Sequence, residues 1–260
     1  MRLILSERYE KNVGFCNFAA NSIAMTLDIC PSPALYPFYK KENDTVIVVD
    51  ILRASTTICA MLNNGAAAVI PVASTDEARH YKSLGFLVGG ERNARKCDFA
   101  DFGNSPFDYT PEIVSGKEVV FTTTNGTQAI EAANDSQALY IGAFSNIDAL
   151  VEKCSDVSGR IVVLCAGWNN RVNMEDTLFG GAFAKKLLKR TNVSIASDYV
   201  KMALDLWQLA KNNPLEYVKK AEHYQRLKSN NAETEVEFCL RENTMEVVPW
   251  YDRKEKKLKK

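Results

Sequence analysis

Short apolar runs rich in β-branched residues alternate with helix-like patterns along most of this chain, and this alternation restricts the fold more than any other feature. Several runs are apolar on both faces, so their strands must be covered by helices on both sides. The runs fall at 26–30, 45–50, 67–72, 86–90, 118–124, 138–143, 160–167 and 236–240. The sequence therefore predicts an α/β fold with three α/β/α layers around a mainly parallel or mixed sheet.

Helical periodicity fills the segments between these runs. The predicted helices span 55–64, 75–84, 126–134, 145–154, 175–190, 198–211 and 214–229. A final strand pair is predicted from 235–240 and 245–252. No repeat, low-complexity block or Pro/Gly linker divides the chain, so we expect a single domain, which can be bilobed.

Both ends of the chain are expected to lie outside this domain, which we predict to span 25–250. Residues 1–24 contain a few apolar residues broken by charges, and we interpret them as an N-terminal extension. Deleting this extension is expected to leave folding and activity intact. Residues 251–260 form a basic C-terminal tail, a pattern typical of a frayed, solvated end.

Composition argues against several classes of protein. The 32 Lys and Arg residues are balanced by 32 Asp and Glu residues, so the basic bias of nucleic-acid-binding proteins is missing. No run of 18 apolar residues is present, which argues against a membrane span. Seven cysteines without Cys-x-x-Cys pairs favour a reducing compartment over a disulfide framework. We expect a cytoplasmic protein without nucleic-acid or membrane partners; the sequence leaves a homo-oligomer open.

Polar residues collect directly after four of the predicted strands. In an open α/β sheet, ligands bind at the carboxyl ends of the strands, where helix N-termini also point. In chain order the four clusters contain Asp50, Arg53, Ser55, Thr56 and Thr57; Glu91, Arg92, Asn104 and Ser105; Thr122, Thr123, Thr124, Asn125, Gly126 and Thr127; and Asn169, Asn170, Arg171, Glu175 and Asp176. One such loop usually only caps a helix, but four at one sheet edge indicate a binding site.

This mixture of acids, arginines and hydroxyls favours binding of a small anionic phosphorylated molecule. Helix N-terminal amides and the planar guanidinium of arginine both bind phosphate. Carboxylates beside a phosphate are favourable when a hard cation such as Mg²⁺ lies between them. The candidate metal ligands are Asp50, Glu91, Glu175 and Asp176. A simpler interpretation of Glu175 and Asp176 is that they only complement a helix dipole.

Motifs that would indicate other reactions are missing from the sequence. It contains no P-loop, no dinucleotide-binding G-x-G-x-x-G after a strand and no G-x-S-x-G nucleophile elbow. Cys165 and Arg171 have the spacing of cysteine phosphatases, but Cys165 still belongs to a predicted strand and the loop carries Trp168.

The histidines and the attacking group leave alternatives open. His80 is expected at the surface, and His223 in a surface or packed position from which it could also reach the site. Asp50 ends a strand as in phosphoaspartate enzymes, although Leu52 stands where their second aspartate is usual. The nucleophile can be Asp50, a metal-bound water or Cys165.

Three long blocks, 46–74, 89–130 and 162–187, resemble the 2-phosphosulfolactate phosphatase family. The motifs that carry the resemblance are D-x-L-R-A-S-T-T from Asp50, G-E-R from Gly90, G-N-S-P from Gly103, T-T-T-N-G-T from Thr122, and Glu175 with Asp176. The similarity extends from about residue 26 to 248, so residues 1–24 have no counterpart in the family.

The resemblance implies a Mg²⁺-dependent phosphatase that converts 2-phospho-3-sulfolactate to 3-sulfolactate and phosphate, a step that belongs to coenzyme M biosynthesis in some organisms. Asp50, Arg53 and Glu91 are then the catalytic residues. Amides at 55–57 are expected to hold the phosphate with Arg53, and 122–125 with Asn104 to hold the rest of the substrate. Arg92 or Arg171 is expected to pair with its sulfonate or carboxylate. A phosphatase for another phosphorylated hydroxy acid and a non-catalytic anion-binding protein are the alternatives.

Overall fold

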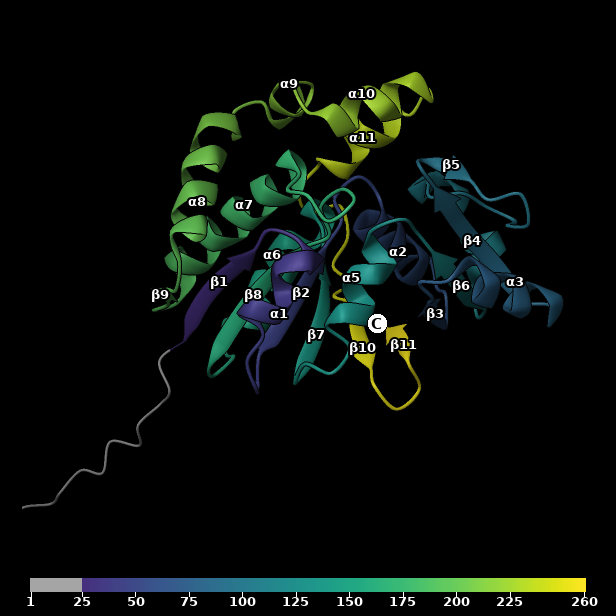
Figure 1. The fold of residues 1–260 in the computed structure, drawn as a ribbon, viewed down its shortest axis with the longest axis horizontal. Helices are drawn as coiled ribbons and strands as arrows, with labels where there is room; N and C mark the ends of the chain where they lie inside the picture. The colour runs from purple at the N-terminus through teal and green to yellow at the C-terminus, as the bar shows by residue number, and fades with distance from the viewer. Residues whose placement is uncertain (1–24) are drawn as a thin grey trace, which may run out of the picture.

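The computed structural model describes residues 25–260 and has the predicted α/β architecture (Figure 1). The predicted N-terminal extension, residues 1–24, lies outside the described residues. An 11-stranded mixed sheet has the strand order β5-β4-β6-β3-β11-β10-β7-β2-β8-β1-β9. The strands are β1 (Thr26–Cys30), β2 (Thr45–Val49), β3 (Ala68–Pro71), β4 (Leu87–Arg92), β5 (Arg95–Lys96), β6 (Glu118–Thr122), β7 (Ala138–Gly142), β8 (Arg160–Cys165), β9 (Ser194–Ile195), β10 (Trp250–Asp252) and β11 (Lys257–Lys259).

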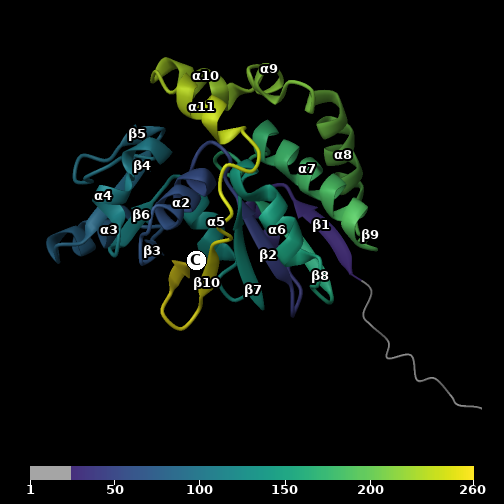
Figure 2. The ribbon, with the colours of Figure 1, turned by 180° about the vertical axis from the view of Figure 1, so that it is seen from behind.

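Helices cover both faces of this sheet. They are α1 (Tyr36–Tyr39), α2 (Ala54–Asn63), α3 (Thr75–Ser83), α4 (Pro111–Val114), α5 (Gly126–Ala132), α6 (Ile147–Cys154), α7 (Met174–Arg190), α8 (Asp198–Ala210), α9 (Pro214–Val218), α10 (Glu222–Ser229) and α11 (Glu233–Cys239). Figure 1 shows α1 and α5 on the near face, and Figure 2 shows α6 on the opposite face. No helix within residues 25–260 combines the length and apolar composition that crossing a membrane requires.

Strand β2 shows why cover is needed on both faces. All five of its residues are buried. Val46 and Val48 enter the core formed with α2 and α5, whereas Ile47 and Val49 enter the core formed with α6, α7 and α8. Because successive side chains of a strand point to opposite faces, an apolar run such as 45–49 requires two cores. The three-layer prediction is confirmed.

The sheet consists of two parallel blocks. One contains β4, β6 and β3, and the other contains β7, β2, β8, β1 and β9. The antiparallel hairpin β10–β11 lies between the blocks, with β11 paired to β3 and β10 paired to β7. These three antiparallel pairings do not by themselves bring the carboxyl ends of the two blocks together, but residues at or after the ends of β2, β4 and β6 line one cavity.

The prediction of a frayed basic tail at 251–260 is wrong. Leu258 is fully buried and pairs with Val69 of β3, so the C-terminal hairpin is an interior part of the sheet. Lys257 and Lys259 form ion pairs with Glu118 and Asp252, which neutralise the charges that suggested a solvated end. The sheet thus extends beyond the predicted boundary at residue 250.

The predicted strand at 236–240 is also wrong, because these residues belong to α11 or its C-terminal end. Val236, Cys239 and Leu240 are buried, and this spacing of three and four residues is helical. The predicted helix 214–229 is interrupted around Lys219–Ala221 and forms α9 and α10 instead. Both changes place a pair of short helices over the carboxyl ends of the strands (Figure 1).

Candidate active site

Residues from both parallel blocks and from the helices above them line one small cavity. Two groups of residues form it. We call residues 50–57, 91–104, 122–127 and 165–176 the sheet-edge wall, and α10 with α11 the helical cap. The polar residues that line the cavity are Asp50, Arg53, Glu91, Asn104, Asn125, Trp168 and His223. Five of these seven were predicted as site residues, and they come from three of the four predicted clusters.

Asp50 presents a carboxylate without a protein partner to this cavity. Its backbone is held in place, because the Asp50 amide donates to Ser55 Oγ (2.8 Å) and the Ser55 amide donates to the Asp50 carbonyl (2.9 Å). Its side-chain oxygens accept no hydrogen bond within residues 25–260. Burial, together with the charge of Asp176, raises the pKa of Asp50 to about 8. The cavity therefore favours a proton or a cation beside this carboxylate.

Gly126 is required by the close approach of the third loop to Asp50. A Cβ atom at this position would lie 2.9 Å from Asp50 Oδ2 and 2.8 Å from the Cβ of Ala54. Any side chain would therefore displace the carboxylate or the start of α2. This contact explains why the T-T-T-N-G-T motif needs a glycine, which the sequence alone does not explain.

Asp176 joins two loops of the sheet-edge wall. Its Oδ1 accepts the Ile51 amide (2.9 Å), and its Oδ2 accepts the Gly167 amide (3.0 Å) and Asn173 Nδ2 (2.9 Å). These three donors stabilise the ionised form and oppose the rise in pKa that burial and Glu175 cause. Asp176 does not line the cavity, so in this structure it positions the ends of β2 and β8.

Glu91 makes the equivalent connection in the smaller block, but it also lines the cavity. Its Oε1 accepts the Thr124 amide (2.7 Å), and its Oε2 accepts the Ala94 amide (2.8 Å). The Thr124 hydroxyl adds a third, longer contact of 3.2 Å. Glu91 thus orders the loop after β6 and lines the same cavity as Asp50.

The predicted phosphate cradle at 55–57 is occupied by the protein itself. The amides of Ser55 and Thr57 donate to the carbonyls of Asp50 and Arg53. The Thr57 hydroxyl donates to the Asn104 carbonyl (3.4 Å), and Ser55 Oγ accepts from Asp50. Thr56 is fully buried. The expectation that the amides of Ser55 and Thr57 hold a phosphate is therefore wrong for this structure, and these residues hold the loop in shape.

The loop hydroxyls after β6 have similar structural partners. Thr123 and Thr127 bond each other's backbone and side chain across the turn that starts α5. Thr122 Oγ1 accepts from Arg92 Nη2 (2.8 Å), and Arg92 also donates to the carbonyls of Ala73 and Glu91. Arg92 is thus bound within the smaller block and does not line the cavity.

Arg53 lines the cavity, whereas Arg171 is exposed to solvent. Arg53 pairs with Glu235 of α11, with 3.2 Å between Nη1 and Oε1. Arg171 closes a two-residue turn, in which Trp168 and Arg171 exchange backbone hydrogen bonds of 2.9 Å. The turn residues Asn169 and Asn170 have φ values of 48° and 61°, which asparagine tolerates well.

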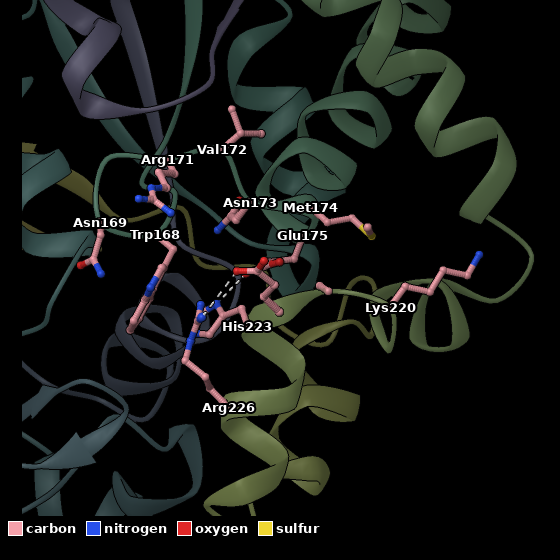
Figure 3. Close-up of a pocket in the computed structure, with 12 residues that line it drawn as sticks. Trp168, Asn169, Arg171, Val172, Asn173, Met174, Glu175, Lys220, His223 and Arg226 are labelled. Carbon is pink, nitrogen blue, oxygen red and sulfur yellow. Dashed lines mark hydrogen bonds and ion pairs between the residues drawn. The ribbon is translucent and has the colours of Figure 1, made fainter.

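The helical cap supplies His223, which was not among the predicted site residues. Its Nδ1 lies 2.6 Å from Glu175 Oε1, both side chains are buried, and its ring centre is 5.2 Å from that of Trp168 (Figure 3). The second oxygen of Glu175, Oε2, is buried without a hydrogen-bond partner among the described residues. In the sequence, His223 lies on a predicted amphipathic helix. This pattern is also typical of a surface position, so it did not single out His223 as a site residue.

Comparison with known proteins identifies the chain. The model of the 2-phosphosulpholactate phosphatase family matches residues 30–254. The chain belongs to this family.

Its relatives carry the same name. A probable 2-phosphosulfolactate phosphatase from Thermotoga petrophila is 41% identical over 208 residues, which cover 80% of this chain and 89% of that protein. The protein of this name from Thermotoga maritima is 40% identical over 208 residues, with the same coverage. The one from Caldanaerobacter subterraneus subsp. tengcongensis is 34% identical over 224 residues, covering 82% of this chain and 92% of that protein. The prediction of a phosphatase of this family is confirmed.

The structure reduces the number of groups in this phosphatase that could attack phosphorus. Cys165 is fully buried in β8, and burial raises the pKa of its thiol well above the usual value. A buried thiol of raised pKa is a poor nucleophile. The resemblance to the cysteine-phosphatase spacing is therefore coincidental. His80 lies on an exposed face of α3, as predicted.

Proposed function

We propose that this enzyme is a Mg²⁺-dependent phosphomonoesterase that hydrolyses 2-phospho-3-sulfolactate to 3-sulfolactate and phosphate. The observation that carries the proposal is the unpartnered, buried carboxylate of Asp50 in one cavity with the guanidinium of Arg53. A lone buried carboxylate is costly unless a ligand or ion compensates its charge. The family and the names of its members support the choice of substrate.

The oxygen atoms around the cavity fit a hard cation. Besides Asp50 and Glu91, the cavity is lined by Asn104, whose side-chain oxygen is buried without a partner among the described residues. Within residues 25–260 no three His, Cys, Asp or Glu side chains form a ready metal cluster. Mg²⁺ usually takes one or two carboxylates and completes its shell with water and substrate phosphate. Asp50, Glu91 and Asn104 would hold the ion, which when bound supplies Lewis-acid stabilisation of charge on the phosphate.

Arg53 is positioned to bind the phosphate. Its pairing with Glu235 uses one nitrogen, and a guanidinium has further donors that fit two phosphate oxygens. Asp50 lines the same cavity. The group that attacks phosphorus is therefore either the Asp50 carboxylate or a water molecule. The side-chain nitrogens of Asn104 and Asn125 can donate to the part of the substrate that does not react, since the Asn104 oxygen would face the ion and Asn125 Oδ1 accepts from the Asn169 amide. The helical cap with Trp168 limits access of bulk water to this reaction.

A phosphate-release assay with several substrates tests the proposal. We expect kcat/KM for 2-phospho-3-sulfolactate to exceed that for 2-phospholactate, phosphoglycolate and sugar phosphates by at least about 10²-fold, because binding groups left unpaired by the wrong substrate are costly. Chelation with EDTA should abolish turnover and added Mg²⁺ should restore it. Equal turnover of all substrates contradicts the assigned substrate, and turnover unaffected by EDTA contradicts the role of Mg²⁺. Binding of phosphate without any turnover would support a non-catalytic protein instead.

A further inference from the structure

Arg226 of α10 is held in place without using its hydrogen-bonding capacity. Its guanidinium carbon lies 3.9 Å from the ring centre of Trp168, which is the geometry of a cation–π contact. Its Nε atom is buried and has no hydrogen-bond partner within residues 25–260. Its ion pair with Glu222 is long, at 4.0 Å, and the Glu222 side chain is 93% exposed. The guanidinium is thus fixed in position with donors left free.

The groove beside Arg226 adjoins the proposed catalytic cavity and shares two of its lining residues. Trp168 and His223 line both the cavity and this groove, which has a volume of about 630 Å³. The groove is further lined by three cationic side chains, Arg171, Lys220 and Arg226. Figure 3 shows Trp168, His223 and Arg226 together beside Glu175, whose Oε1 is bonded to His223. A molecule that extends from the cavity past Trp168 would therefore meet Arg226.

A phosphorylated sulfolactate needs a second cationic side chain close to its phosphate site. Its carboxylate and sulfonate add negative charge next to the phosphate, and Arg53 is the cation within the cavity. Arg92, one predicted partner of these groups, is bound to Ala73, Glu91 and Thr122 instead. A guanidinium whose plane is fixed on an aromatic ring has less freedom to lose on binding, and its fork matches carboxylate and sulfonate oxygens.

We propose that Arg226, supported by Trp168, is the specificity-determining residue that binds the second anionic group of the substrate. This inference rests on the proposed function insofar as it requires a phosphorylated substrate with a second anion. Arg226 does not contact the reacting phosphorus in this arrangement; it selects phosphate esters of small acids over phosphate esters of neutral alcohols. The site therefore binds two anionic groups of one substrate, the phosphate in the cavity and a carboxylate or sulfonate in the groove.

The two reaction products test the cavity and the groove separately, because 3-sulfolactate carries the carboxylate and the sulfonate without the phosphate, and inorganic phosphate carries neither of those two groups. They are used as inhibitors of 2-phospho-3-sulfolactate hydrolysis by the full chain with Mg²⁺. Arg226→Met keeps most of the contact with Trp168 but removes the charge, and Arg226→Lys keeps a charge without the fork. Lys228→Met is the matched control, since Lys228 is exposed on the same helix.

In Arg226→Met the inhibition constant of 3-sulfolactate should rise about 100-fold, the size expected for loss of a charged hydrogen-bond partner, while that of inorganic phosphate changes less than about 3-fold. Arg226→Lys should recover part of the loss and Lys228→Met should match the wild type. Lactate and isethionate, used as further inhibitors, show whether the carboxylate or the sulfonate is the group bound. No change for either product, or an equal rise for both, overturns the proposal. Failure of the wild type to hydrolyse the substrate would overturn the proposed function instead.

Discussion

The two walls of the cavity hold their polar side chains in different ways. In the sheet-edge wall, carboxylates and hydroxyls mostly accept from backbone amides, as Asp176 does from Ile51 and Gly167. In the helical cap, polar side chains pair with other side chains, as His223 does with Glu175 and Glu235 with Arg53. The first kind of contact fixes the shape of the loops, whereas the second connects two parts of the molecule.

This difference separates two tasks within one site. The sheet-edge wall is rigid, because its side chains cannot leave without breaking backbone hydrogen bonds in a buried region. The cap packs apolar side chains such as Leu227 and Val236 into the core, and it meets the polar residues of the wall through a few side-chain pairs, so removing one of these pairs should leave the sheet undisturbed. Asp50 belongs to the sheet-edge wall but differs from its other carboxylates, since its side chain has no protein partner among the described residues. Four substitutions test this division.

Asp50→Asn is expected to have the largest effect. Loss of the carboxylate should lower kcat by at least about 10³-fold, because it removes the group proposed to attack or to hold the cation. The melting temperature without metal should stay equal or rise, because burial disfavours the ionised carboxyl and raises its pKa to about 8, whereas the amide carries no charge. Steady-state kinetics and thermal unfolding check both parts. Activity near the wild-type level would place the reaction elsewhere in the molecule.

Asp176→Ala should mainly affect folding. The substitution leaves the buried amides of Ile51 and Gly167 without their acceptor, which should lower the free energy of unfolding by about 3 kcal/mol. Urea denaturation measures the change. Asp198→Ala is the matched control, because Asp198 is exposed and also lies in the first turn of a helix. A loss no larger than in the control would show that Asp176 does not hold the two loops together.

His223→Ala tests the connection between the cap and the sheet-edge wall. Glu175 then has no hydrogen-bond partner for either oxygen in a fully buried position, and we expect a loss of about 2 kcal/mol in the free energy of unfolding. Adding Glu175→Gln should recover part of this loss, because the second change removes the unpartnered charge. His80→Ala, at an exposed position, should leave stability unchanged. Additive losses in the double variant would mean that the two residues do not interact.

Glu235→Gln should have the smallest effect. It weakens the contact that holds the Arg53 guanidinium towards the cap, and kcat/KM should fall about 10-fold through a higher KM, as for loss of one charge-assisted hydrogen bond. Glu237→Gln, on the same helix with an exposed partner, is the control. A lower KM instead would show that Glu235 competes with the substrate phosphate for Arg53.

Much of the sheet-edge wall could be predicted because its signals are local. Asp50 and Ser55 are five residues apart and bond each other, and Thr123 and Thr127 are four residues apart. Carboxyl ends of parallel strands meet at one edge, so polar residues converge by geometry within each block, as after β2 and β8 and after β4 and β6. The approach of one block's cluster to the other, across the antiparallel β10–β11 hairpin, could not be predicted in this way. The same reasoning wrongly assigned phosphate binding to the amides of Ser55 and Thr57. The sequence could not show that these amides already donate to backbone carbonyls.

The sequence by itself determined the layered α/β fold, the strand ends at which the polar clusters lie and the family motifs, since each depends on local periodicity and on residues close to one another in the chain. Only the tertiary structure decided that the basic C-terminus pairs inside the sheet and that α10 and α11 close the site. The Arg53–Glu235 and Glu175–His223 pairs join residues 182 and 48 positions apart. On an amphipathic helix, a side chain that will face a cavity has the same neighbours in sequence as one that will face solvent, so packing alone distinguishes them.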